Sequence, residues 1–245
     1  MSLNNVDIKR VIRQQFSYKC KANTSLFTSM IVIQLIAVLF SLSGTGMIGT
    51  SIGYNGVSIQ FYSGDIVLVF TMIWAFITAI MLTTKTYTET DYVFVANHLT
   101  SNLSNIAFLF VASVIGAITS LLAVYLLKVV MLLFFDHGWM AASQEISVGQ
   151  WVSGFLTTIF YLFMFSAIGY LIGQLTQRNK LFIVIIPAFI IGSLVIFVGS
   201  TILMDISQFY FNDSSFFSVF IKTVGTSFIL FLISMVLSNG QEVRK

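Results

Sequence analysis

Long apolar runs alternate with short polar segments along most of the chain. The hydrocarbon core of a bilayer is about 30 Å thick, so a helix needs about 20 mostly apolar residues to cross it. Segments that meet this requirement cover residues 25–43, 64–82, 105–127, 151–175, 181–203 and 216–237. The pattern predicts an all-α integral membrane protein with six transmembrane helices. Residues 1–245 would form a single domain, with a bundle over 25–237 and a short cytoplasmic tail over 238–245.

The first 23 residues follow a different pattern. Apolar residues recur at three- and four-residue spacing, at Ile8, Val11, Ile12 and Phe16. Basic and polar residues occupy the remaining faces. This spacing predicts an amphipathic interface helix that lies on the inner membrane surface. Two interpretations remain open: the helix is a membrane anchor only, or it also borders a docking surface for a cytoplasmic protein.

The stretch TETDYVFVANHLTSNLSN, residues 88–105, is the least apolar long stretch in the middle of the chain. A threonine at its start can cap a short helix that ends near Leu99, with Glu89 and Asp91 close to the positive end of the helix dipole. Tyr92, Val95 and Leu99 belong to one apolar stripe of this helix. Such a short helix is marginal alone in water, so its own spans or a partner protein must pack against it. Residues 99–104 are then expected to form a hinge.

Composition supports a membrane location and excludes several kinds of chemistry. Hydrophobic residues make up 57% of the chain and charged residues 9%, whereas soluble domains carry about 25% charged residues. One cysteine and two histidines give neither a disulfide framework nor a zinc-site spacing, so we expect no metal and no catalytic residues. Within the six predicted spans the charged residues are Asp65 and Lys222, each near a span end. A carrier that uses a buried carboxylate is therefore disfavoured.

The distribution of basic residues predicts the orientation. If the six spans alternate, one side receives Lys9, Arg10, Arg13, Lys19, Lys21, Lys85, Arg178, Lys180, Arg244 and Lys245. The other side receives Lys128 and Lys222. We therefore expect a multi-pass plasma-membrane protein with both termini in the cytoplasm. Lys128 and Lys222 are expected to reach lipid headgroups, and the alternative that they meet an anionic cargo stays open.

This organisation resembles the permeases of ATP-binding-cassette exporters of the ABC-2 class. The resemblance covers nearly the whole chain and includes the stretch YVFVANHLTSNLSNIAFL, residues 92–109. It implies that residues 89–99 form a coupling helix on a separate ATPase subunit, with Glu89, Asp91, Tyr92, Val95 and Leu99 as coupling residues. It also implies a second permease chain, identical or paralogous. An outer gate would form between the fifth and sixth spans, at Phe209, Phe211, Phe216 and Phe217.

The chain contains no GxxxxGK[ST] phosphate loop, so we expect it not to be an ATPase itself. ATP and Mg would be bound by the partner subunit, and the chain would need no cofactor and bind no nucleic acid. Polar residues scattered in the spans, such as Gln34, Thr71, Thr157 and Ser166, are interpreted as the wall of a route for a hydrophobic or amphipathic cargo: a lipid-like molecule, a peptide or a drug. The alternative is a non-transporting membrane protein that acts in binding, sensing or immunity.

Overall fold

A computed structural model describes residues 8–44, 46–52, 55–61, 63–84, 87, 98–134, 147–197, 201–212 and 215–239. Most of this part of the chain is helical. The helices are α1 (Ile8–Ala22), α2 (Thr24–Ser41), α3 (Asp65–Thr83), α5 (His98–Phe134), α6 (Val148–Arg178), α7 (Phe182–Phe197), α8 (Thr201–Phe211) and α9 (Phe216–Asn239). Two strands, β1 (Gly46–Ile52) and β2 (Asn55–Phe61), lie between α2 and α3.

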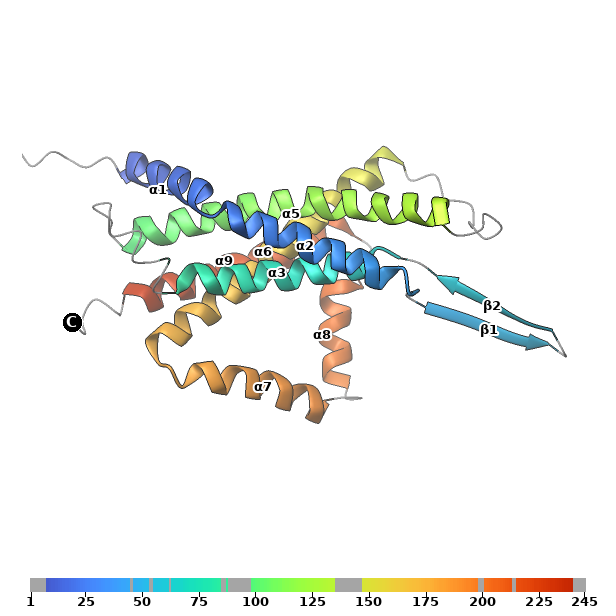
Figure 1. The fold of residues 1–245 in the computed structure, drawn as a ribbon. Coiled ribbons are helices and arrows are strands. Elements are labelled where there is room, and N and C mark those ends of the chain that lie inside the picture. Colours follow the sequence, from blue (N-terminus) through green and yellow to red (C-terminus); the bar gives the residue numbers. More distant parts are fainter. Residues whose placement is uncertain are drawn as a thin grey trace, which may run out of the picture.

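Helices α2, α3, α5, α6 and α9 run side by side in an elongated bundle (Figure 1). Helix α1 and the last residues of α9 lie at one end, and the β hairpin projects from the opposite end. We call these the α1 end and the hairpin end. Helices α3 and α6 make the most extensive contact between helices, whereas α1 packs mainly against α5.

The five bundle helices are each long and apolar enough to cross a membrane. The chain is therefore a multi-pass membrane protein with five candidate spans, at positions that the hydropathy pattern predicts. Helix α5 is longer than predicted: its 37 residues extend for about 55 Å, which exceeds the thickness of the hydrocarbon core.

The sixth predicted span, residues 181–203, is divided between two helices. Helix α7 has 16 residues, about 24 Å of helix, and is shorter than the hydrocarbon core is thick. Helix α8 runs from the level of α7 towards the bundle, nearer its hairpin end, and makes a steep angle with α7 (Figure 1). The predicted continuous helix is therefore wrong, and a total of six spans stays a prediction. Pro187 lies inside α7. Two apolar side chains of this helix are largely exposed, Val184 at 71% and Phe189 at 74%.

The all-α prediction missed the hairpin. Strands β1 and β2 pair antiparallel, with Ile48 opposite Ile59 and Thr50 opposite Val57. The signal in the sequence was the alternation of β-branched residues on both sides of residues 53–54, which is typical of a hairpin.

The centre of the bundle is closely packed. Met30, Trp74, Phe108, Leu162 and Tyr170, from four helices, belong to one buried cluster.

Several polar residues inside the bundle bond to one another or to the helix backbone. The Nε2 of Gln34 donates to the Oγ1 of Thr71 at 3.2 Å and to the Oγ1 of Thr119 at 3.0 Å. The Oγ of Ser166 donates to the carbonyl of Leu162 at 2.9 Å. Gln34, Thr71 and Ser166 are buried, and Thr157 is half-buried. The bonds of Gln34 therefore connect α2 to α3 and α5, whereas the bond of Ser166 stays within α6. A role of these residues in a cargo route stays a prediction.

Candidate functional site

Helix α1 presents two different faces. Gln15 and Lys19 lie four residues apart and are buried, which places them on the same side of a helix that packs against α5. Of the predicted apolar face, Phe16 packs against the core cluster, Val11 and Ile12 are half-buried, and Ile8 is 62% exposed. The seam between α1 and the bundle is thus partly polar, a feature that the apolar periodicity did not reveal. Contact of Ile8, Val11 and Ile12 with the membrane stays a prediction.

A chain of hydrogen bonds starts at Lys19 and connects three helices. The ammonium of Lys19 donates to the Oγ of Ser104 at 2.8 Å and to the Oδ1 of Asn105. The Nδ2 of Asn105 donates to the hydroxyl of Tyr170 at 3.2 Å, and that hydroxyl donates to the Oδ1 of Asn102 at 2.8 Å. We call these five residues the Lys19 network. It links α1 through the first turns of α5 to the C-terminal third of α6.

Three side-chain amides at the same end have unpaired atoms. Both polar atoms of Gln15, the Nδ2 of Asn102 and the Nε2 of Gln177 are buried without a hydrogen-bond partner. Burying an unpaired polar group costs about 1–3 kcal/mol, so native proteins rarely retain such groups without a reason. The α1 end is therefore not optimised for stability alone.

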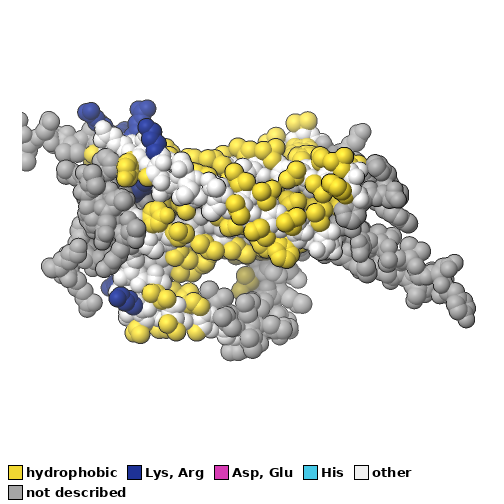
Figure 2. Space-filling view, viewed as in Figure 1, with side chains coloured by type: hydrophobic (Ala, Val, Ile, Leu, Met, Phe, Trp, Pro, Cys, Tyr) yellow, Lys and Arg dark blue, Asp and Glu magenta, His cyan; other side chains and the backbone are white. Residues whose placement is uncertain are grey.

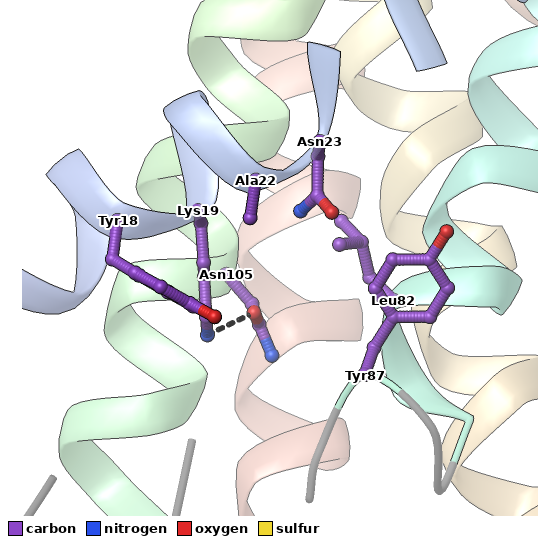
Figure 3. A pocket seen from close by; sticks show the side chains of 7 residues that line it. All are labelled: Tyr18, Lys19, Ala22, Asn23, Leu82, Tyr87 and Asn105. Atoms are coloured by element: carbon purple, nitrogen blue, oxygen red, sulfur yellow. Dashed lines mark hydrogen bonds between the residues drawn. The ribbon is translucent and has the colours of Figure 1, made fainter. Parts of the chain in front are cut away.

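A small recess opens beside the Lys19 network, between α1, the end of α3 and the start of α5 (Figure 3). Its polar lining comes from Tyr18, Lys19, Asn23, Tyr87 and Asn105, and Ala22 and Leu82 add apolar walls.

Most of the predicted coupling helix lies outside the described residues. This applies to Glu89, Asp91, Tyr92 and Val95. Leu99 belongs to the first turn of α5 and is 43% exposed. The predicted hinge over residues 99–104 is wrong, because α5 is continuous from His98 onward and packing against α1 and α6 buries several of its first polar residues.

At the hairpin end, three of the four predicted gate phenylalanines lie in aromatic contacts. The ring of Phe211 stacks on Tyr161 with 5.2 Å between centroids, and the hydroxyl of Tyr161 donates to the carbonyl of Tyr210. The ring of Phe216 lies 6.1 Å from that of Phe160. Phe217 is 67% exposed. These contacts fix α8 and the start of α9 against α6.

Phe209 is held by Lys222. The ammonium of Lys222 donates to the carbonyl of Phe209 at 2.8 Å and lies 4.0 Å from the centroid of its ring. Lys222 thus binds the last turn of α8, where the helix dipole favours a cation. Its contact with headgroups or with an anionic cargo stays a prediction. Lys128 lies 5.4 Å from the ring centroid of Tyr125.

Within the described part of the chain, no three His, Cys, Asp or Glu residues come together as metal ligands would. No known protein family, curated protein or solved structure matches the chain.

Proposed function

We propose that the chain is the membrane subunit of an ATP-driven exporter of the ABC-2 type, which moves a hydrophobic or amphipathic cargo outward. The observation that carries the proposal is the Lys19 network. It gives a basic surface helix a direct connection to α5 and α6. In an exporter whose motor is another protein, force must enter at the cytoplasmic end and reach the spans through such a connection.

The segment between α3 and α5 supports the same function. Helix α3 ends at the α1 end, and α5 begins there at His98, directly before the network residues of α5. A partner ATPase, which would bind ATP and Mg, would dock on residues 89–99 and on α1. Movement of this segment would then displace Ser104 and Asn105, and with them α1 and α6.

The basic residues of the α1 end favour one orientation in the membrane. The α1 end, where basic side chains gather (Figure 2), would face the cytoplasm of a cell with this protein in its plasma membrane.

Because the polar residues inside the bundle bond one another, we place the cargo route between two permease chains, identical or paralogous. The aromatic contacts around α8 would form its outer gate.

The decisive experiment is purification of the tagged chain from its native membrane in mild detergent, followed by mass spectrometry and an ATPase assay. Leu99→Asp adds a charge to an exposed residue in the first turn of α5, where the helix dipole tolerates an acid. We expect recovery of an ATPase subunit with the wild-type chain and at least about tenfold weaker association with Leu99→Asp, the effect of losing an interface anchor.

Val148→Asp is the matched control. Val148 is the first residue of α6, at the hairpin end, and is 80% exposed, so the variant adds the same charge at a helix start away from the proposed interface. It should bind the ATPase as the wild type does. Recovery of the chain alone, without ATP hydrolysis, would instead favour a stand-alone binding, sensor or immunity protein.

A further inference from the structure

Asn23 is a buried polar side chain that its own helix does not use. It occupies the N-cap position of α2 and is 6% exposed, but its side chain makes no capping hydrogen bond. An asparagine at this position ordinarily accepts a bond from an amide of the first helical turn. Within the described part of the chain the Asn23 side chain has no hydrogen bond, and it lines the recess beside Lys19 (Figure 3).

The recess is suited to an anion. Its lining combines the ammonium of Lys19, which is 5% exposed, with the side-chain amide of Asn23 and the hydroxyls of Tyr18 and Tyr87. Among the described side chains that line it, none is acidic. The recess itself is small, with a volume of about 10 Å³, and it is open at its mouth. This is room for about one oxygen-sized group. Each of these groups is of a type that donates hydrogen bonds to a phosphate oxygen, and bonds from a charged donor are the stronger ones.

The surroundings of the recess add positive charge. Helix α1 carries exposed Lys9, Arg10, Arg13 and Lys21 and contains no acidic residue. The basic side chains gather at this end of the molecule (Figure 2). Basic residues near a membrane surface attract anionic lipids. Anionic headgroups would therefore concentrate around the mouth of the recess.

We propose that this recess binds the phosphate group of an anionic phospholipid from the leaflet at the α1 end. A phosphate oxygen accepts hydrogen bonds inside the recess, from Asn23 among others, and the rest of the headgroup stays at the mouth. Free inorganic phosphate offers the same chemistry and is the other source. The site goes beyond the proposed transport function, because a lipid bound here would fix α1 against the bundle in an exporter and in a stand-alone membrane protein alike.

The test measures thermal unfolding of the purified full-length chain in detergent with short-chain phosphatidylglycerol, short-chain phosphatidylcholine or sodium phosphate. Phosphatidylglycerol should raise the wild-type Tm by about 5 °C near saturation. Asn23→Leu keeps the size of the side chain but removes its amide, and should lose most of this shift. A shift with sodium phosphate at the same concentration would identify free phosphate as the source, and none would identify the lipid.

Lys19→Met and Lys21→Met form a matched pair, because each removes one positive charge from α1 and only Lys19 lines the recess. The first should lose the shift and the second should keep it. If Lys19→Met does not fold, Asn23→Leu against Lys21→Met decides the question. An Asn23→Leu protein with the full wild-type shift would overturn the proposal. So would an equal shift with phosphatidylcholine that persists in Asn23→Leu, since acyl chains alone would then explain it.

Discussion

Tyr170 is the residue on which the Lys19 network depends most directly. Its hydroxyl accepts from Asn105 and donates to Asn102, and the residue is fully buried. Tyr170→Phe would leave both amides with an unpaired group, so we expect a loss of about 1–3 kcal/mol in the free energy of unfolding. Denaturation in detergent measures this loss. Tyr125→Phe is the control: Tyr125 stacks on Trp151 and is 40% exposed, so the change should stay below about 0.5 kcal/mol. Equal stability of the two variants would argue against a structural role for the network.

Cys20 reports how tightly α1 is packed, because it is the only cysteine of the chain. Burial raises the pKa of its thiol above the ordinary value, and the thiolate is the reactive form. Near neutral pH the thiolate fraction is therefore lowered, and alkylation should be slower than for an exposed cysteine. The rate should rise with pH until the raised pKa is passed.

The same thiol tests the contact made by Lys19. Lys19→Met removes the bonds from α1 to Ser104 and Asn105, so α1 should loosen and maleimide should label Cys20 faster. Lys21→Met, which changes an exposed residue, should leave the labelling rate at the wild-type value. Unchanged labelling in both variants would show that Lys19 does not hold α1.

At the scale of elements, glycine fixes the closest helix contact. A Cβ at Gly169 would overlap the carbonyl oxygen of Phe76 in α3, and one at Gly173 would overlap the side chain of Thr83. These two glycines therefore allow α6 to pack closely against α3 within one chain. Gly169→Ala should force α3 and α6 apart and cost about 1–3 kcal/mol of stability. Gly154→Ala, in the same helix with nothing within 4 Å, should be neutral or slightly stabilising. Urea unfolding of the two variants in detergent separates these outcomes.

Helix α8 depends on Lys222 for its C-terminal anchor. Lys222→Met would remove the bond to the carbonyl of Phe209 and the contact with its ring. We expect the amides of residues 201–211 to exchange hydrogen about tenfold faster, the effect of losing a charge-assisted hydrogen bond. Lys128→Met, which changes the other cation of the hairpin end, should leave this exchange unchanged. If α8 is protected equally in both variants, its position rests on Tyr161 and the aromatic contacts instead.

At the scale of the whole molecule, the hydropathy pattern predicted which segments are apolar enough to cross a bilayer. It did not predict where the chain changes direction. It located five candidate spans because a crossing helix must be apolar along its full length. It joined α7 and α8 because the residues of both helices are mostly apolar, so that hydropathy does not show where one helix ends and the next begins. It also missed the hairpin, whose side-chain alternation extends over only seven residues in each strand.

At the candidate site, too, the sequence predicted the helix but not its long-range contacts. The spacing of apolar residues predicted α1. It assigned the contacts of this helix to its apolar residues, because an amphipathic pattern does not show which residue a polar side chain bonds. The partners of Lys19 lie 85 and 86 residues further along the chain. Only the packing of α1 against α5 brings them together, so no local pattern could have predicted the network or the unpaired amide of Asn23.

Orientation is a property of the whole chain and can be tested with single cysteines in a Cys20→Ser background. Lys180 and Val148 flank opposite ends of α6, and both are exposed. If basic residues determine the topology, the α1 end faces the cytoplasm. A membrane-impermeant maleimide should then label Val148→Cys in intact cells and Lys180→Cys only after permeabilisation. The reverse labelling pattern would show that the α1 end faces outward. A cytoplasmic ATPase could then not contact residues 89–99. Labelling of both in intact cells would mean that α6 does not cross the membrane.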